Sequence, residues 1–163
     1  MLDFTRILKE LSENNVEYMV VGGIAVNLHG IPRMTYDLDL LVNMTDENLD
    51  RFMRIIKKLK YTAKVPVDIM DFAVKEKRRK WIEEKNMKAF CLVNNKATVK
   101  EIDIIIDAPV SYQNAKKNMI TMELQNISVP VIGIADLIKM KEKTGRRQDD
   151  SDIRYLKKKI NEE

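Results

Sequence analysis

The sequence is poor in several residue types that would mark special classes of protein. It has a single cysteine, Cys91, so no disulfide can form within the chain, which suits a reducing compartment. No apolar run approaches the roughly 18 residues of a membrane-spanning helix. The N-terminal stretch MLDFTRILKELSENN mixes acidic with apolar residues and lacks the basic start and continuous apolar core of a signal peptide. We therefore expect a cytoplasmic protein without a membrane segment.

The rest of the composition is that of a folded domain. The 163 residues are 45% hydrophobic and 33% charged, and no internal repeat or low-complexity linker divides them. The net charge of +4 permits an anionic partner, although lysine that serves only solubility explains it equally well. We expect one domain over residues 1–163, of the α/β or α+β class, with a mixed β-sheet flanked by helices.

Helical and strand-like patterns alternate along the chain. Spacing of apolar residues predicts helices over residues 3–14, from 24 to 29, over 45–60, from 134 and over 149–160, with a short helix after Ser111 and a charged helical segment over 75–88. Strands are predicted over 18–21, 37–42, 89–93 and 99–106, with a hairpin over 119–124 and 127–132 and a strand or extended loop over 61–74. The C-terminal helices, at about 133–161, are expected to complete a cleft.

Two aspartates stand one residue apart in the stretch VVGGIAVNLHGIPRMTYDLDLLV, residues 20–42. In a strand, Asp37 and Asp39 point to the same face, about 7 Å apart along the backbone. Two like charges on a half-buried face repel unless a cation lies between them, and Mg²⁺ suits carboxylates together with water and substrate phosphate. A strand-end pair that simply faces solvent explains the pattern equally well.

A second acidic strand strengthens the metal-site interpretation. Residues 101–107 read EIDIIID, with acidic residues embedded in isoleucine. Asp103 lies within the apolar run, Glu101 shares its face as the competing choice, and Asp107 is expected in a solvated turn. Three carboxylates on two strands are typical of two-metal phosphoryl transfer.

Gly22-Gly23 follows the first predicted strand directly. Glycine allows positive φ and close approach of another group to the backbone, and free amides at a helix start can bind phosphate. A Gly-Gly pair by itself is often no more than a tight turn, but here it precedes the two aspartates.

The order hGG, then R-x-T-x-D-h-D, then h-D-h resembles the nucleotidyltransferase superfamily of the DNA polymerase β type. The sequence supplies Gly22-Gly23, then RMTYDLD over residues 33–39, then Ile102-Asp103-Ile104. The C-terminal segment KEKTGRRQDDSDI is similar to the K-x4-R and Asp motifs of AbiEii-like nucleotidyltransferases. The resemblance runs from about residue 16 to 156.

The resemblance implies a single nucleotidyltransferase fold and a metal-dependent reaction. Mg²⁺ or Mn²⁺ would be the cofactor, and NMP would pass from an NTP to a protein, tRNA or small-molecule acceptor, with a role in a toxin–antitoxin pair as one implied function. Asp37 and Asp39 would hold the metal that binds the triphosphate, and Asp103 would help to bind a second metal and activate the acceptor hydroxyl. The implied nucleotide-binding residues are Gly22, Gly23, Arg33, Thr35, Lys141 and Arg146, supported by Asp149 and Asp152.

Several of these residues have a simpler structural explanation. Arg33 could form a salt bridge to Asp37, and Thr35 could only order the start of the strand. Lys141 and Arg146 lie about 140° apart on an ideal helix, so they are surface charges unless Gly145 redirects the chain. The AbiEii-like pattern usually has Gly-Ser where this chain has Gly-Gly, so phosphate binding would rest on backbone amides.

Two other classes of function stay open. One is a catalytically silent protein that binds a nucleotide or a partner on the same scaffold. The other is a nucleic-acid-binding module that uses the basic residues 75–80 and 157–159. The chain has little room for an acceptor-binding domain, so a partner protein or a homodimer is a candidate for completing the site.

Overall fold

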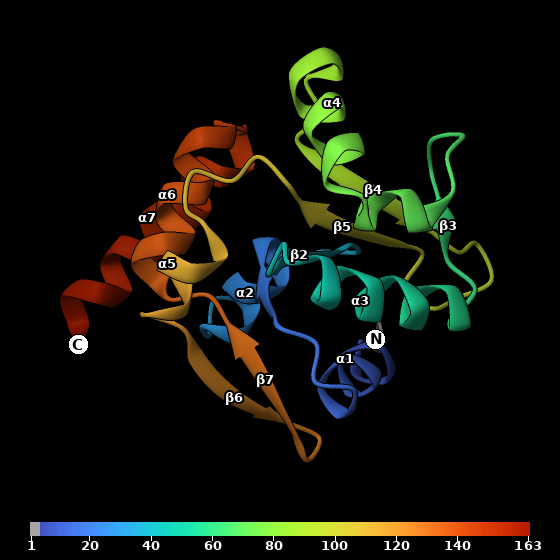
Figure 1. Cartoon of the computed structure of the whole chain (residues 1–163). Coiled ribbons are helices and arrows are strands. Elements are labelled where there is room, and N and C mark those ends of the chain that lie inside the picture. Colours follow the sequence, from blue (N-terminus) through green and yellow to red (C-terminus); the bar gives the residue numbers. More distant parts are fainter. Residues whose placement is uncertain (1–3) are drawn as a thin grey trace.

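A computed structural model describes residues 4–163. These residues form one α/β domain built on a seven-stranded mixed sheet with the strand order β3-β4-β5-β2-β1-β7-β6 (Figure 1). The strands are β1 (Tyr18–Val21), β2 (Leu38–Val42), β3 (Thr62–Ala63), β4 (Ala89–Val93), β5 (Glu101–Ile105), β6 (Ile120–Leu124) and β7 (Ile127–Val131). The expected class and the hairpin over β6 and β7 are confirmed.

The central strands of the sheet pair in both parallel and antiparallel directions. β2 pairs with β1 in antiparallel fashion and with β5 in parallel fashion, and β1 also pairs in parallel with β7. β4 is antiparallel to β5 on its other side. Strands β1, β2 and β5 are rich in Val, Leu and Ile because both faces of a central strand are largely covered. The acidic residues of β2 and β5 therefore lie in the middle of the sheet.

Helices cover the sheet and close its ends. They are α1 (Thr5–Glu13), α2 (Gly22–Leu28), α3 (Asp46–Lys58), α4 (Lys75–Lys85), α5 (Tyr112–Lys116), α6 (Ile134–Thr144) and α7 (Arg147–Glu162), with a 3-10 turn, η1 (Ile69–Ala73). Thr45 and Ser111 cap α3 and α5 by accepting hydrogen bonds from the backbone N–H groups of Asn48 and Asn114. The first residue of the expected helix over 3–14 lies outside the described residues.

The sequence-based boundaries needed correction in three places. Residues 61–74 were predicted as a strand or loop, but most of that segment leads into η1, whose Ile69 and Phe72 are buried under α3. Helix α2 begins at Gly22 itself, two residues earlier than predicted. Strand β2 begins at Leu38, so Asp37 immediately precedes it.

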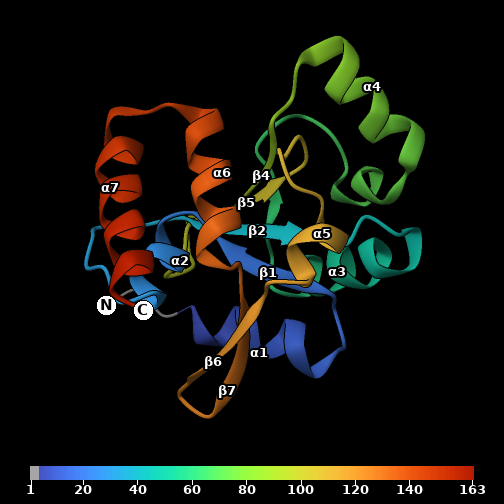
Figure 2. The ribbon, with the colours of Figure 1, turned by 90° about the vertical axis from the view of Figure 1, so that its left-hand side faces the viewer.

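Helices α6 and α7 lie side by side at one end of the sheet (Figure 2). Gly145, between them, has φ +60°, in the left-handed region that glycine adopts most easily, and it ends α6. Leu137 and Ile138 of α6 and Leu156 of α7 are buried. No helix within residues 4–163 is long and apolar enough to cross a membrane.

Candidate active site

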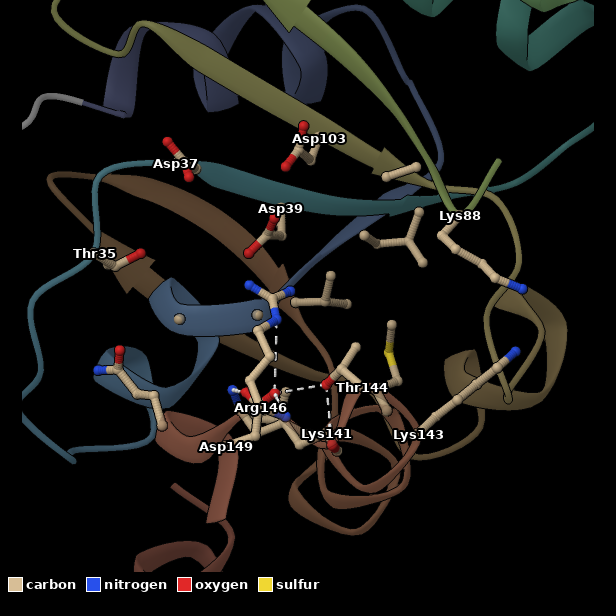
Figure 3. Close-up of a pocket in the computed structure, with 18 of the residues that line it drawn as sticks. Thr35, Asp37, Asp39, Lys88, Asp103, Lys141, Lys143, Thr144, Arg146 and Asp149 are labelled. Carbon is tan, nitrogen blue, oxygen red and sulfur yellow. Dashed lines mark hydrogen bonds and ion pairs between the residues drawn. The ribbon is translucent and has the colours of Figure 1, made fainter. Parts of the chain in front are cut away.

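A pocket of about 550 Å³ opens between the middle of the sheet and helices α2 and α6 (Figure 3). One wall is formed by the end of β1 with the first turn of α2, and another by α6 and the beginning of α7. Its charged lining residues are Arg33, Asp37, Asp39, Lys88, Asp103, Asp107, Lys141, Lys143, Arg146 and Asp149. Gly22, Gly23 and Thr35 also line it. The pocket thus gathers residues from both ends of the sequence.

The aspartates come together through the register of two parallel strands. Asp39 of β2 lies directly opposite Asp103 of β5, so both side chains point to the same face of the sheet. Asp37 stands one residue before β2 and lines the same pocket. Glu101 forms an ion pair with Lys64, with Nζ and Oε1 3.0 Å apart, and does not line the pocket. Of the two acidic residues of β5 that the sequence offered, Asp103 and not Glu101 lines the pocket, and its metal-binding role stays a prediction.

The proximity of these carboxylates alters their acidity. Burial, together with the negative charges of Asp103 and Asp37, raises the pKa of Asp39 to about 7. Burial and the charges of Glu101 and Asp103 also raise the pKa of Asp37. Each carboxyl group is therefore harder to ionise than an isolated aspartate. A bound cation would offset the repulsion between the ionised carboxylates.

The donor set is suited to a hard divalent cation. Carboxylate oxygens are the ligands that Mg²⁺ and Mn²⁺ prefer, and Mg²⁺ is commonly bound by one or two carboxylates, with water and substrate phosphate completing its shell. In the described part of the chain, no three acidic, His or Cys side chains are grouped so that they could hold one metal ion. The aspartates present fit a metal ion whose coordination shell is completed by oxygens of the substrate phosphate. A set of three carboxylates around one ion stays a prediction.

Both glycines are packed directly against site residues. Gly22 has φ +65°, and a Cβ atom on it would lie 1.9 Å from Oδ2 of Asp39. A Cβ atom on Gly23 would lie 2.7 Å from Oγ1 and 2.9 Å from Cβ of Thr35. Side chains at these positions would displace the site residues. The glycines are therefore needed for close packing around the pocket, whatever their amides bind.

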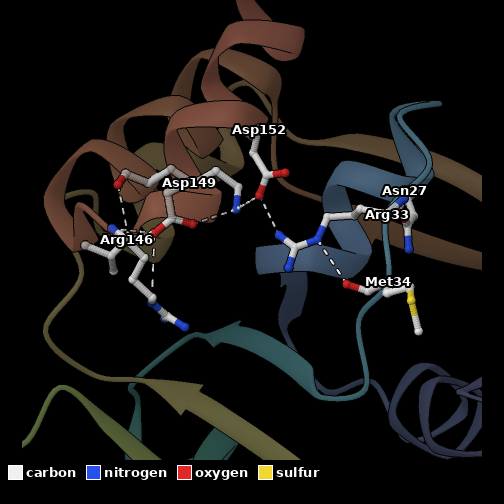
Figure 4. A network of polar contacts seen from close by, with 8 residues as sticks. Asn27, Arg33, Met34, Arg146, Asp149 and Asp152 are labelled. Atoms are coloured by element: carbon white, nitrogen blue, oxygen red, sulfur yellow. Dashed lines mark hydrogen bonds and ion pairs between the residues drawn. The ribbon is translucent and has the colours of Figure 1, made fainter.

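A chain of buried charges joins the two halves of the pocket (Figure 4). Asp152 of α7 accepts hydrogen bonds from Arg33 and from Lys141, whose Nζ lies 2.8 Å from Oδ2. The Lys141 ammonium also contacts Asp149, 3.3 Å away. The salt bridge of Arg33 to Asp37, one of the two alternatives that the sequence left open, does not form, because Asp152 takes the guanidinium instead. Lys141 is only 5% exposed, so it is not a surface charge, and two carboxylates already hold its ammonium.

Arg146 occupies a different environment from Lys141. Gly145 redirects the chain, as its position between the two cations suggested, and Arg146 becomes the cap residue of α7. Its backbone N–H donates to Asp149, but its side chain is 78% exposed. Figure 3 shows this side chain reaching toward Asp39, and its positive charge acts to lower the pKa of both Asp37 and Asp39. Arg146 is thus placed to meet an anion bound over the carboxylates.

A cationic group at the opposite end of the pocket was not predicted from the sequence. Lys88 and Lys143 both contact the carboxylate of Asp107, with Lys143 Nζ 3.6 Å from Oδ2. Asp107 was expected in a solvated turn, but these two lysines lower its pKa. The three residues lie on the segment before β4, the segment after β5 and α6, so only the folded chain brings them together.

The remaining candidates are structural. His29 is 4% exposed and its Nε2 lies 2.7 Å from the carbonyl oxygen of Ile132, so this residue is packed in the interior. Cys91 is half-buried and lies opposite Asp103, on the neighbouring strand β4. Burial and the nearby Asp103 raise the pKa of its thiol to about 12, so it is not activated as a nucleophile.

Solved structures with the same fold include several nucleotidyltransferases. A candidate nucleotidyltransferase from Thermotoga maritima is 17% identical, with a TM-score of 0.57 over 97% of this chain and 90% of that one. The lincosamide antibiotic adenylyltransferase LnuA, with lincomycin bound, is 18% identical, with a TM-score of 0.58 over 93% and 92%. ANT(2")-Ia, solved with adenylyl-2"-tobramycin, is 14% identical, with a TM-score of 0.58 over 94% and 85%.

No family model and no curated protein matches the chain by sequence. The structural similarity therefore establishes the fold alone. The chain has the nucleotidyltransferase fold, which it shares with adenylyltransferase enzymes.

Proposed function

We propose that this protein is a metal-dependent nucleotidyltransferase that transfers NMP from an NTP to an acceptor hydroxyl. The observation that carries the proposal is the parallel register that sets Asp39 against Asp103 on the pocket-lining face, with Arg146 across from them. Carboxylates for a cation on one wall and an exposed guanidinium on the other fit a metal-bound triphosphate.

The residues of the chain have distinct roles in this reaction. Asp37, Asp39 and Asp103 would hold Mg²⁺ or Mn²⁺, and the bound ion would supply positive charge to neutralise and orient the triphosphate. Asp103 takes the proton of the acceptor hydroxyl as its oxygen forms a bond to the α-phosphorus. The bond from that phosphorus to the bridging oxygen breaks, and pyrophosphate leaves with the electron pair. Arg146 offsets negative charge on the departing phosphates.

The buried pairs of Lys141 with Asp149 and Asp152 serve mainly to position this machinery. Lys141 has little ammonium surface left for a ligand, but it ties α6 to α7 and thereby fixes the loop that carries Arg146. Asp152 does the same for Arg33 and the segment that leads into β2. A direct contact of Lys141 or Arg33 with the triphosphate is a further part of the proposal.

The proposal is tested by incubating the protein with each α-³²P-labelled NTP, Mg²⁺ or Mn²⁺, and a cell extract. We expect label to move to an acceptor and unlabelled pyrophosphate to be released, and both signals to be absent with Asp39→Asn. Binding of NTP without any transfer, in all extracts and with all four nucleotides, would instead assign the chain to the catalytically silent class. The fold relatives that adenylylate antibiotics make small molecules one acceptor class to include.

The AbiEii-like spacing of Lys141, Arg146, Asp149 and Asp152 further supports a place in that branch and a role in a toxin–antitoxin pair. That role predicts arrested growth of a bacterial host that expresses the protein alone, and normal growth with Asp39→Asn. A partner protein or a second copy of the chain would complete the acceptor side of the pocket, which sedimentation analysis of the purified protein can test.

A further inference from the structure

Two lysines share one carboxylate at the end of the pocket away from Arg146 (Figure 3). Lys88 precedes β4 and Lys143 belongs to the last turn of α6, and both form ion pairs with Asp107, which follows β5. Lys143 also donates a hydrogen bond to the backbone carbonyl oxygen of Asp107, 2.9 Å from its Nζ. All three residues line the pocket. Two positive charges against one negative charge leave this end of the pocket cationic.

The two ammonium groups keep donors that their contacts with Asp107 do not use. An ammonium group has three N–H donors. In the described part of the chain, Asp107 is the only ion-pair partner of Lys88 and of Lys143, and these lysine side chains are 58% and 41% exposed. The ammonium of Lys141, which lines the same pocket, is by contrast buried between two carboxylates. Lys88 and Lys143 are therefore able to bind a ligand that enters the pocket.

An apolar surface separates this cationic end from the carboxylates of the sheet. Asp103, Ile105 and Asp107 all line the pocket and follow one another at intervals of two residues. Two residues of a strand span about 7 Å, and such residues point to the same face. Ala89 lies opposite Ile105 on β4 and also lines the pocket. A ligand that reaches from Asp103 to the lysines would therefore cross an apolar stretch.

The proposed reaction determines which end of the pocket the acceptor uses. In phosphoryl transfer the attacking and the leaving oxygen lie roughly in line, on opposite sides of the phosphorus. Pyrophosphate that leaves toward Arg146 requires the acceptor hydroxyl to approach from the other side, where Lys88 and Lys143 lie. A cationic acceptor would be repelled by these lysines, whereas an anionic acceptor would form charge-assisted hydrogen bonds with them.

We propose that the acceptor is a small molecule with a phosphate or carboxylate group, and that Lys88 and Lys143 bind this group while the acceptor hydroxyl faces the α-phosphorus. This inference rests on the proposed function, because it assumes a metal-bound NTP at the carboxylates. It goes beyond that function by naming the chemical class of the acceptor. A nucleic acid would gain from further free cations near the lysines, but Lys77 and Arg79 of the preceding helix α4 are paired with acidic neighbours.

The closing experiment measures, by calorimetry, how the full chain saturated with Mg²⁺ and a non-hydrolysable NTP binds glycerol phosphate, glycerate and neutral glycerol. We expect both anions to bind at least about tenfold more tightly than glycerol, as for hydrogen bonds to a charged group. Lys88→Gln/Lys143→Gln should remove most of this advantage and leave the affinity for the NTP unchanged. Lys58→Gln, which breaks an exposed ion pair with Glu10 outside the pocket, is the matched control and should change neither affinity.

Asp107→Asn distinguishes a binding role of the lysines from a structural one. Asparagine keeps the shape of the side chain but no longer competes with the ligand for the two ammonium groups. We therefore expect Asp107→Asn to bind glycerol phosphate more tightly, by about threefold. If the three residues only stabilise the fold, this variant should weaken binding as the lysine variant does. The melting temperature identifies a variant that fails to fold, in which case Lys88→Gln and Lys143→Gln are tested singly.

The outcomes separate this inference from the function on which it rests. If the NTP binds but the anions bind no more tightly than glycerol, or bind equally well to the lysine variant, only the inference fails. If the lysine variant loses affinity for the NTP instead, the lysines belong to the nucleotide site and the inference is overturned. Lysine-dependent binding of a single-stranded RNA in place of the small anions would overturn it as well. If the folded original protein binds none of the four NTPs with Mg²⁺ or Mn²⁺, the proposed function fails and the inference fails with it.

Discussion

Gly22 and Asp39 are in such close contact that a single added methyl group at residue 22 would lie 1.9 Å from Oδ2 of the carboxylate. The contact forms where β1 ends and α2 begins, with Gly22 at φ +65°. Position 22 therefore needs glycine for two separate reasons, its backbone conformation and the space that its neighbour occupies. The carboxylate of Asp39 is held against a backbone turn that no other residue could form without displacing it.

Gly22→Ala should accordingly destabilise the protein and disturb the pocket. We expect a loss of about 2 kcal/mol or more in the free energy of unfolding, from positive φ and from the collision combined. Gly145→Ala is the control, because Gly145 also has positive φ but has nothing within 4 Å of an added Cβ. It should cost only about 1 kcal/mol. Urea unfolding measures the free energy of unfolding of both variants. Equal losses would show that the contact between residue 22 and Asp39 does not affect stability.

The Arg33–Asp152–Lys141 network should be a large contributor to stability. Asp152 is 4% exposed, and its removal leaves two cations without a shared partner. For Asp152→Asn we expect the free energy of unfolding to fall by about 3 kcal/mol, since breaking a buried ion pair leaves uncompensated charge. Glu142→Gln, which breaks only the exposed pair with Lys157, should change it by less than about 0.5 kcal/mol. An equally small change in the free energy of unfolding for Asp152→Asn would show that the buried network does not stabilise the protein.

The metal-free protein should lose stability as pH rises toward neutrality because of Asp39. Its pKa is about 7 in the folded protein, against an ordinary value of 3.8. The folded state therefore binds more protons than the unfolded state between these values. The contribution of Asp39 to stability is fully present below pH 3.8 and is lost as pH rises to about 7. The loss is on the order of 4 kcal/mol.

Urea unfolding between pH 4 and 8, with chelator present, measures this effect against Asp39→Asn, which keeps the shape and cannot ionise. The contribution of Asp39 is the difference between the two proteins in how the free energy of unfolding depends on pH, because the other titrating groups are common to both. Addition of Mg²⁺ at pH 8 should stabilise the original protein and not the variant. Identical pH profiles for the two proteins would mean that Asp39 ionises without electrostatic cost.

Local sequence patterns predicted much of the fold because they report on burial. The strands β1 and β2, the hairpin and helix α3 all carry apolar periodicity or caps that stand out in a single sequence. The segment around η1 was mispredicted because VPVDIMDF alternates like a strand, whereas Ile69 and Phe72 actually pack beneath α3. Alternation alone does not distinguish a strand from a short turn that buries two residues.

The site could be predicted only where its residues are near in sequence. Asp37 and Asp39 are on one face by the geometry of any strand, but Asp103 could be chosen over Glu101 only from the pairing of β5 with β2. The partner of Arg33 is 119 residues away, so no local pattern could reveal that Asp152 displaces Asp37 in that role. Long-range pairing of this kind is a property of the folded chain.

The proposed function requires that the carboxylate face and Arg146 together bind a metal-bound triphosphate. Calorimetric titration of the protein with each NTP, in Mg²⁺ and then in chelator, tests it most directly. We expect binding that requires the divalent cation and that falls at least tenfold in Asp39→Asn and in Arg146→Ala, with both variants folded. NTP affinity that is unchanged by chelator, or unchanged in Asp39→Asn, would contradict it.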